Sequence, residues 1–505
     1  MSHALRSSTV DGIIRRSART YRDRLALVFG EREWTYAALD LAVSRAAGRL
    51  LGLGLAKGDR VAAYGKNSDA YLIGFLACAR AGLVHVPLNY NLTGAELSYL
   101  ISQSGARAIL VDPALEAPLE GVDAEVLERL EHRIPLRDKA GSIVETATEA
   151  AVPTIEVDVA DTDVAQFLYT SGTTSRPKAA MMSHRALVHE YVSCIVGLDL
   201  HADDNPLHVM PLYHSAQMHV FLMPWLAIGA TNTILEVPDG TEILRRIERD
   251  GHRAFFAAPT LWVALTNHAD FETRDLSGLR KAYYGASIMP VPIIRRLEAK
   301  MPGLGFYNCF GQSEIAPLAT ILRPEEHADR PDSAGRPCLF VEARVVDEHG
   351  DDVPVGQTGE IVYRSPHLCD GYWDNPQATE EAFAGGWFHS GDLVRMDEAG
   401  YVFVVDRIKD VINTGGVLVA SREVEDALYT HPAVAEVAVV GMPDEKWVEA
   451  VTAFVVRKGE VTEAELVAHA RTTLAGFKIP KRITFVDELP RNASGKILKR
   501  DLRGS

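Results

Sequence analysis

The sequence predicts an α/β protein with a large N-terminal domain, a small β-rich lobe and a small C-terminal α+β domain. Through the first few hundred residues, strand-like runs alternate with runs of helical spacing, which is typical of parallel sheets covered by helices. After about residue 335 the chain becomes β-rich, with Asp and Gly turns between apolar runs. Beyond Arg407, helices and strands alternate within roughly a hundred residues, enough for a domain that folds alone.

The first elements follow from the spacing of apolar residues. A helix is predicted from Trp34 to the glycines at 52 and 54, because six apolar residues share one helical face: Leu39, Ala42, Val43, Ala46, Leu50 and Leu53. The run that follows predicts a strand at 60–65, a buried helix at 68–82, a strand at 84–89, a helix at 93–105 and a strand at 106–111. A capping box from Thr93 to Glu96 is expected to open the helix at 93–105.

The second half predicts the lobe and the terminal domain. Strands are expected within 340–365 and at 400–407, and the terminal domain should contain a helix at 421–432, strands at 435–442, 452–457 and 482–489, and a helix opened by Thr462 and Glu465. No long Ser, Pro or Gly linker and no internal repeat is found, so a short hinge should join the domains. We therefore expect domains at 1–406, with the β-rich lobe at about 336–406, and at 407–505.

Composition excludes several classes of protein. The chain has 505 residues, of which 47% are hydrophobic and 24% charged, the mixture of a soluble globular protein. Its net charge of −16 disfavours nucleic acid and anionic membranes as partners. The five cysteines are scattered, which makes a disulfide framework or a structural zinc site improbable. The N-terminus lacks the apolar segment of a secretory signal and the apolar run at 219–230 is too short for a transmembrane segment, so a cytoplasmic location is expected.

One loop carries the strongest chemical signal. From Thr170 to Pro177 every residue except Arg176 is Ser, Thr, Gly or Pro, and Lys178 follows. Accessible backbone N–H groups, hydroxyls and a cation can together wrap a polyphosphate, although the order differs from that of the ordinary P-loop. An arbitrary cluster of this composition is more often a flexible surface loop.

The whole string changes that balance, because it resembles YTSGTTGxPKG, the signature of the adenylate-forming superfamily of acyl- and aryl-CoA synthetases, luciferases and adenylation domains. Seven segments resemble the family's signatures in the family's order: 168–184, 210–214, 283–287, 308–314, 387–393, 404–416 and 490–503. The chain is therefore identified as a member of this superfamily. Its motifs most resemble those of the fatty-acid–CoA ligase branch. The resemblance implies ATP, Mg²⁺ and coenzyme A as cofactors and a mobile C-terminal domain.

The resemblance also assigns roles to residues of the N-terminal domain. Ser313 should reach a phosphate, Glu314 should hold Mg²⁺, Phe310 should stack on adenine and His214 should lie between the carboxylate and the CoA channel. The other positions implied to contact the nucleotide are Thr170, Ser171, Gly172, Thr173, Thr174, Lys178, Gly285, Ala286, Asn308 and Gly311. Taken alone, Glu314 would more often be a solvated charge and Phe310 plain core.

Further roles fall near and beyond the hinge. Asp392 and Arg407 should bind the ribose hydroxyls, Lys409 coincides with the hinge of the family, and Gly415 and Gly416 should help to build a tunnel for the thiol. Without the resemblance, Asp392 and Arg407 would each be interpreted as an ordinary turn residue or as part of an ion pair between domains. Lys496 is implied to be the lysine required for adenylation, where its cation would bridge the carboxylate and the α-phosphate. The alternative for Lys496 is an ordinary surface lysine in a basic tail.

The chain departs from the family pattern in a few places. Ser175 and Ala179 stand where glycine is usual, so a positive φ at Ser175 would strain the phosphate loop. Leu418, Ala420 and Ser421 replace the usual residues after the Gly415–Gly416 loop. Ser313 replaces Thr but keeps the hydroxyl.

Three functions remain open from the sequence. The first is an AMP-forming acid:CoA ligase, in which Lys496, Thr173, Lys178 and Mg²⁺ would absorb the developing charge. The second forms the same adenylate but loads a carrier protein or, as in luciferases, oxidises the acyl group. The third is a non-enzymatic protein that retains the fold, which the intact Lys496, Glu314, Asp392 and Arg407 argue against.

The expected acid is an apolar one. The candidate pocket residues carry no Arg or Lys, which disfavours a second carboxylate: Met210, Tyr213, Met218, Trp225, Tyr284, Gly285, Ala286 and Ile315. Core packing of Met218 and Trp225 is an equal alternative. A medium or long chain fatty acid is expected first, and a hydroxycinnamate or benzoate second. Acetylation of Lys496 by a lysine acetyltransferase would remove its charge and is expected to regulate activity. The sequence does not distinguish a monomer from a homodimer.

Overall fold

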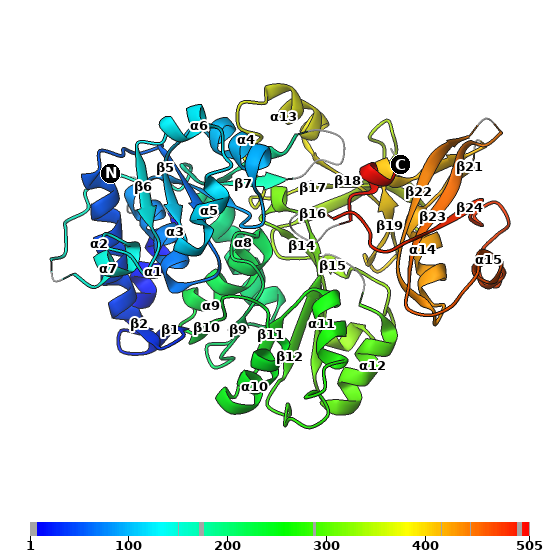
Figure 1. Cartoon of the computed structure of the whole chain (residues 1–505), viewed down its shortest axis with the longest axis horizontal. Coiled ribbons are helices and arrows are strands. Elements are labelled where there is room, and N and C mark those ends of the chain that lie inside the picture. Colours follow the sequence, from blue (N-terminus) through cyan, green and yellow to red (C-terminus); the bar gives the residue numbers. More distant parts are fainter. Residues whose placement is uncertain are drawn as a thin grey trace. The chain divides into compact units, whose positions relative to one another are not determined.

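The computed structural model describes residues 8–149, 151–170, 176–285, 289–415, 417–444, 446–491 and 497–503. Two compact units are formed, the first by 1–170, 177–342 and 364–388, and the second by 171–176, 343–363 and 389–505. The predicted α/β class, with parallel sheets in a large N-terminal part and strands with helices in a small C-terminal part, is confirmed (Figure 1).

The first unit is built on two largely parallel sheets. The nine-stranded sheet has the order β15-β14-β13-β12-β11-β9-β10-β1-β2. Its strands are β1 (Leu25–Phe29), β2 (Arg32–Thr35), β9 (Leu207–His208), β10 (Asn232–Ile234), β11 (Ala254–Phe256), β12 (Lys281–Gly285), β13 (Gly305–Gly311), β14 (Leu318–Leu322) and β15 (Arg336–Pro337). The six-stranded sheet has the order β6-β5-β3-β4-β7-β8. Its strands are β3 (Arg60–Tyr64), β4 (Val84–Leu88), β5 (Ala106–Val111), β6 (His132–Pro135), β7 (Val164–Thr170) and β8 (Lys178–Ser183).

Helices cover both faces of each sheet, so the unit has five layers. The middle layer lies between the sheets and comprises α1 (Val10–Thr20), α2 (Tyr36–Gly52), α3 (Asp69–Ala81), α7 (Ile143–Ala147), α8 (His184–Gly197), a π-helix η3 (Ala216–Leu222) and α9 (Met223–Ala227). The six-stranded sheet is covered outside by α4 (Gly94–Ser104), η2 (Pro113–Leu115), α5 (Glu116–Leu119) and α6 (Ala124–Glu128). The nine-stranded sheet is covered outside by α10 (Gly240–Asp250), α11 (Pro259–Thr266) and α12 (Val291–Lys300), which lie beside β11 and β12 in Figure 1.

The alternation of side chains along the strands explains this layering. In β3, Val61 and Ala63 join the core between the sheets, whereas Ala62 and Tyr64 join the core beneath α4. A strand whose two faces are both buried must be apolar at every position, which is the continuous apolar run that the sequence shows. Four short elements complete the unit: η4 (Ser313–Ile315), η5 (Pro324–Glu326), α13 (Pro376–Ala382) and η6 (Ala384–Gly386).

Two expectations about the first elements were wrong in detail. Trp34 lies in strand β2, and the helix begins at Tyr36, because the Thr35 hydroxyl accepts a hydrogen bond from the Ala38 N–H and caps it. Thr93 is the N-cap of α4 but makes no side-chain capping bond, so the predicted capping box is absent there. The capping box of Thr462 and Glu465 is formed as predicted.

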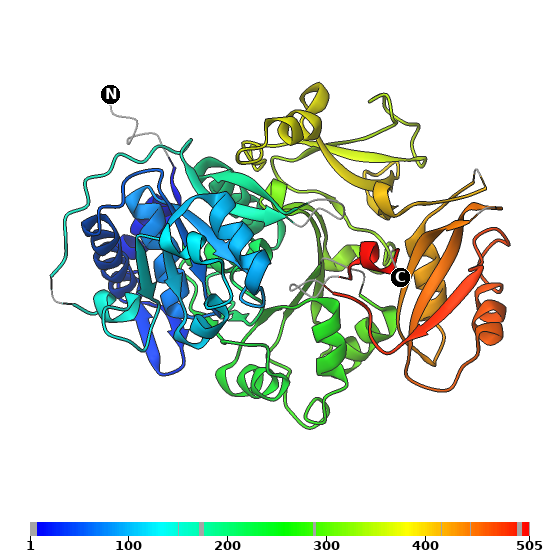
Figure 2. The same cartoon turned by 45° about the horizontal axis from the view of Figure 1, so that its top comes forward.

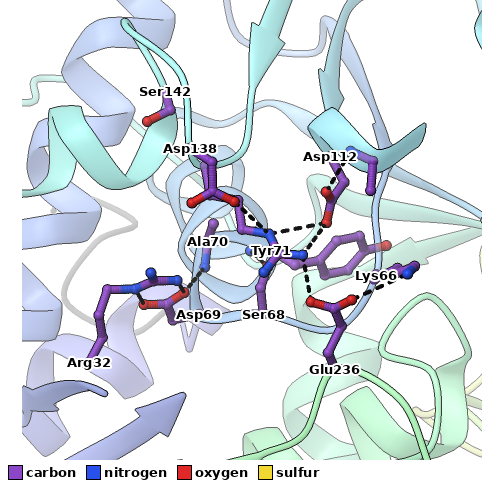
Figure 3. Close-up of polar contacts among 12 residues, drawn as sticks. Arg32, Lys66, Ser68, Asp69, Ala70, Tyr71, Asp112, Asp138, Ser142 and Glu236 are labelled. Atoms are coloured by element: carbon purple, nitrogen blue, oxygen red, sulfur yellow. Dashed lines mark hydrogen bonds and ion pairs between the residues drawn. The ribbon is translucent and has the colours of Figure 1, made fainter. Parts of the chain in front are cut away.

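Charged side chains tie the two sheets together where their strands end (Figure 3). Arg137, just after β6, lies 3.0 Å from Asp112 after β5 and 2.7 Å from Glu236 after β10. Lys66, after β3, approaches the same Glu236 at 3.2 Å. Because Glu236 follows the nine-stranded sheet and the other residues follow the six-stranded sheet, the network links the two sheets directly.

The second unit contains a four-stranded and a five-stranded sheet. The first has the order β16-β17-β18-β19, with β16 (Glu342–Val346), β17 (Thr358–Arg364), β18 (Phe388–Met396) and β19 (Val402–Arg407). The second comprises β20 (Ile412–Thr414), β21 (Val417–Val419), β22 (Val434–Asp444), β23 (Val448–Arg457) and β24 (Arg482–Val486). Its helices are η7 (Ile408–Asp410), α14 (Ser421–Tyr429), α15 (Glu463–Ala470) and α16 (Lys499–Leu502).

Within this unit, α14 and α15 pack on one face of the five-stranded sheet, and the α16 residue Leu502 packs on the other. Figure 2 shows β22 and β23, in orange, side by side with the redder strand β24. None of the helices in the described parts of either unit combines the length and apolar character needed to cross a membrane.

Candidate active site

The predicted phosphate loop connects two antiparallel strands of the first unit. Thr170 ends β7, Lys178 begins β8, and the two residues are paired across the ladder. The loop therefore leaves and re-enters the sheet at one point, with the Lys178 cation at its base. Ala179 lies within β8 opposite Tyr169, so alanine in place of glycine is accommodated by ordinary strand geometry.

Tyr372 links the base of this loop to Glu314. The Lys178 ammonium lies 5.1 Å from the centre of the Tyr372 ring, a cation–π distance. The Tyr372 hydroxyl donates to Oε1 of Glu314 at 3.0 Å, and burial raises the pKa of Tyr372 above its ordinary value, so the phenol keeps its proton. The structure thus brings together Lys178 and Glu314, which the sequence separates widely, through a tyrosine that carried no chemical signal.

Glu314 is held by its backbone as well as by its side chain. It lies in the short helix η4, is 7% exposed, and its carbonyl accepts a hydrogen bond of 2.8 Å from the Cys369 N–H. The neighbouring Ser313 hydroxyl lies 3.2 Å from the hydroxyl of Ser215, which follows His214. A buried carboxylate with a neutral donor is a suitable hard oxygen ligand for Mg²⁺, so the residues present fit the metal that the sequence implies.

Two glycines permit the close approach of chain segments here. A Cβ on Gly311 would lie 2.0 Å from the Pro317 carbonyl oxygen, and one on Gly285 would lie 2.3 Å from the Cys309 carbonyl oxygen. Backbone atoms cannot yield at these distances, so both positions exclude any side chain. Gly285 thereby brings the end of β12 against β13, and Gly311 brings the end of β13 against the η4 turn.

The predicted adenine contacts lie on β13. Phe310 keeps part of its surface exposed, as a stacking platform requires. Asn308 donates its amide to the Ser333 carbonyl at 3.0 Å, which fixes the orientation of that side chain. Both residues lie on the strand that leads into the Glu314 turn.

His214 lies in a turn that is anchored from outside the motif. Its ring is exposed, yet the surrounding protein desolvates it and lowers its pKa below 6.5, a combination expected of a side chain lining a recess. The Ala216 N–H lies 3.3 Å from Nδ1, which leaves Nε2 to carry the proton of the neutral ring.

Asn67 is the anchor of this turn. The Asn67 amide nitrogen donates to the carbonyls of Met210 at 2.9 Å and Leu235 at 3.2 Å, and its oxygen accepts from the Leu212 N–H at 2.8 Å. Sequence reasoning missed this residue, which lies three positions after the end of strand β3. Since the bonds reach more than 140 positions along the chain, only the structure reveals what Asn67 holds.

We expect Asn67→Asp to destabilise the protein and to slow adenylate formation. The substitution keeps the acceptor for Leu212 but turns an oxygen towards two carbonyls, which leaves buried acceptors unsatisfied and should lower the free energy of unfolding by about 2–4 kcal/mol. Displacement of the His214 turn should lower the rate about tenfold or more. Urea unfolding and pyrophosphate release measure the two effects; Asn267→Asp, the same change at an exposed position, is the control. Equal behaviour of the two variants would contradict the role.

The two predicted ribose contacts are neighbours in the second unit. Asp392 on β18 pairs with Arg407 on β19 across the ladder, and Arg407 Nε lies 3.0 Å from Asp392 Oδ1. Asp392 is 4% exposed, and its N–H is fixed by the Ser390 hydroxyl at 3.0 Å. The sequence left each residue open as an ion-pair partner, and here they pair with each other.

Arg503 contacts the segment in which the sequence predicts the hinge. Arg503 donates to the Lys409 carbonyl at 3.0 Å and to Asp410 at 3.2 Å. Gly415 adopts φ 65° in the turn between β20 and β21, where its glycine identity is required.

The departure at Ser421 has a structural reason. Its buried side chain donates to Asp406, the residue before Arg407, at 2.9 Å and accepts from Lys499 at 2.6 Å. Lys499 also lies 2.8 Å from Glu425, whose pKa is raised by burial. Ser421 therefore joins strand β19 to the C-terminal tail.

Several predicted residues lie outside the described part of the chain: Ser171, Gly172, Thr173, Thr174, Ser175, Ala286, Gly416 and Lys496. Among the predicted pocket residues, Met210 and Tyr213 keep exposed surface. Met218, Trp225, Tyr284 and Ile315 are buried in the core of the unit. Trp225, for example, donates its indole N–H to Asp204 at 3.1 Å and packs among aromatic rings.

Comparison with known proteins shows the family to which the chain belongs. Residues 14–373 match the model of the AMP-binding enzyme family, and 423–496 match its C-terminal domain. A feruloyl-CoA synthase of Amycolatopsis sp is 37% identical over 97% of each chain. The medium/long-chain-fatty-acid–CoA ligase FadD8 of Mycobacterium tuberculosis is 34% identical over 99% of this chain and 90% of the relative.

Solved structures of similar fold point to the same family. ATP-bound MatB from Rhodopseudomonas palustris superposes with a TM-score of 0.89 at 31% identity, covering 98% of this chain and 99% of that one. The o-succinylbenzoate CoA synthetase MenE from Bacillus subtilis, in complex with ATP and magnesium, gives a TM-score of 0.87 at 27% identity, with 98% and 99% covered. The chain therefore belongs to the AMP-binding enzyme family of the adenylate-forming superfamily and is an AMP-forming acyl-CoA synthetase that uses ATP, Mg²⁺ and coenzyme A.

Proposed function

We propose that the acid activated by this enzyme is a compact aryl acid of the hydroxycinnamate type. The observation that carries the proposal is the packing of the expected pocket, in which Met218 and Trp225 are only 1% exposed. Side chains that fill the core cannot line a channel for a long alkyl chain. The accessible apolar surfaces of Met210 and Tyr213 suit a short, flat acyl group. The full-length likeness to a feruloyl-CoA synthase supports the same choice.

The reaction needs no nucleophile from the protein. The carboxylate attacks the α-phosphate of ATP, pyrophosphate leaves, and the thiol of CoA then displaces AMP from the acyl-adenylate. We assign to Lys178 and the phosphate loop the binding of the phosphates, and to Ser313 a phosphate contact. Glu314, oriented by Tyr372, would hold Mg²⁺, which when bound neutralises phosphate charge.

The remaining groups orient the reactants. The Asp392 carboxylate is an acceptor for a ribose hydroxyl, and Arg407 fixes its position. Neutral His214 can accept or donate one proton without adding charge beside the carboxylate. Lys496 would place a cation between the two anions that must meet.

A medium or long chain fatty acid is the second candidate. FadD8 supports it, since the relative covers 99% of this chain at 34% identity. The apolar candidate pocket residues also suit an alkyl chain, provided that Met218 moves from its buried position. Loading of a carrier protein instead of CoA is the third alternative.

The test is acid-dependent pyrophosphate release with MgATP, followed with and without CoA. We expect ferulate and 4-coumarate to exceed octanoate and palmitate in kcat/KM by about tenfold or more, since a filled pocket rejects added methylene groups. AMP and a thioester should appear with CoA and not with a phosphopantetheinylated carrier protein. Faster turnover of palmitate than of ferulate would refute the aryl proposal, and turnover restricted to the carrier protein would refute CoA as acceptor.

A further inference from the structure

A buried carboxylate, Glu190, and a buried histidine, His367, form an ion pair close to the segments that contact Glu314. Oε2 of Glu190, on α8, lies 3.1 Å from Nδ1 of His367, and both side chains are 0% exposed. Placing a carboxylate in the interior costs several kcal/mol unless a partner compensates it. The residues around this buried ion pair indicate why it is present.

The hydrogen bond at Nε2 fixes the orientation of the His367 ring. Nε2 of His367 lies 2.9 Å from the hydroxyl of Ser193, and that hydroxyl donates its only proton to the Leu339 carbonyl. Ser193 must therefore accept from His367, so Nε2 carries a proton. Nδ1 on the other side of the ring faces Oε2 of Glu190 at 3.1 Å, within the distance of an ion pair.

Each member of the pair is connected to Glu314 through a short series of backbone and side-chain contacts, called here a route. Oε1 of Glu190 accepts a hydrogen bond of 2.9 Å from the Leu318 N–H, four residues after Glu314. His367 lies two residues before Cys369, whose N–H donates to the Glu314 carbonyl at 2.8 Å. The same segment continues to Tyr372, whose hydroxyl holds Oε1 of Glu314 at 3.0 Å. Glu314 itself and the chain four residues after it are thus both connected to the place where Glu190 meets His367.

We propose that Glu190 and His367 are positioning residues that lock the Glu314 carboxylate in the orientation needed to bind Mg²⁺ with ATP. The proposal rests on the proposed role of Glu314. Neither residue can touch the substrate, because neither has exposed surface. Their effect must pass through Leu318 on one side and through Cys369 and Tyr372 on the other.

Two substitutions at position 190 separate positioning from simple stability. Glu190→Leu has a similar size but removes both contacts, whereas Glu190→Gln keeps an acceptor for Leu318 and can donate to a neutral His367. We expect Glu190→Leu to raise the Mg²⁺ concentration needed for half-maximal ATP binding about tenfold, by titration calorimetry. Glu190→Gln should stay within about threefold of the wild type.

His367→Leu tests the second route. It should reproduce the shift in Mg²⁺ dependence, and the double variant with Glu190→Leu should add little, because both act on one unit. Partial unfolding would lower the number of binding sites but would leave the Mg²⁺ midpoint of the folded molecules unchanged. The midpoint therefore reports positioning.

Asp112→Leu is the matched control. Asp112 is 1% exposed and pairs with Arg137 at 3.0 Å in the network of Figure 3. Within the described part of the chain its side chain bonds to Ala114 and Arg137 and not to the Glu314 segment. It should lose stability without a shift in the Mg²⁺ midpoint. An unshifted midpoint in Glu190→Leu, or an equal shift in Asp112→Leu, would overturn the inference. If the wild type bound ATP without any dependence on Mg²⁺, the proposed role of Glu314 would fail instead.

Discussion

Replacement of Glu314 by Gln should lower kcat/KM for adenylate formation by about 10²–10³-fold. The two side chains have the same shape, and the amide oxygen of Gln can still accept the Tyr372 hydroxyl, which lies 3.0 Å away in the wild type. What disappears is the negative charge and with it a hard anionic ligand for Mg²⁺. The loss should therefore appear in the chemical step and in the affinity for the metal, and not in the fold.

The measurement is acid-dependent pyrophosphate release across a titration of Mg²⁺. Excess Mg²⁺ should restore part of the activity, because mass action compensates a weakened site. Glu326→Gln is a matched control, since Glu326 is 9% exposed and pairs with Arg336 at 2.8 Å, on a different turn. Wild-type Mg²⁺ dependence in Glu314→Gln would show that another group holds the metal.

The secondary structure was predictable from the sequence where it depends on residues only a few positions apart. The burial of both faces of β3, with Val61 and Ala63 in one core and Ala62 in the other, follows from the continuous apolar run. The left-handed Gly82 that ends α3 likewise follows from residue chemistry a few positions apart. Local signals also misled. Thr93 carries the right side chain for a capping box, but the bond is not made.

The candidate site was predictable only in part. Lys178 and Glu314 could be named from motifs, and the distance between Asp392 and Arg407 follows once β18 and β19 are adjacent strands. Tyr372 and Asn67 could not be named, because their partners lie 58 and 145 positions away and no local pattern encodes such pairing. The π-helix at 216–222 was missed for a related reason, since its turns differ from those of an α-helix by one residue and leave no distinct apolar period.

Replacement of Lys496 by Gln should separate the two half-reactions. We expect pyrophosphate release to fall by about 10²–10³-fold, because a cation that neutralises charge between the carboxylate and the α-phosphate acts only in the transition state of that step. Thioester formation from synthetic acyl-adenylate and CoA should stay within about threefold of the wild type, since the family turns this domain away from the phosphates for the second step. Gln is neutral, as acetyl-lysine is, so the same split is expected of enzyme acetylated at Lys496.

The matched control is Lys458→Gln, an exposed lysine of the same unit. It removes the same charge and should leave both half-reactions unchanged. Lys499 would be a poor control, because its ammonium lies 2.6 Å from the Ser421 hydroxyl and 2.8 Å from Glu425 and so ties the tail to helix α14. If Lys496→Gln slowed both half-reactions equally, the lysine would act through the stability or hinge motion of the terminal domain, and the charge-bridging role would be wrong.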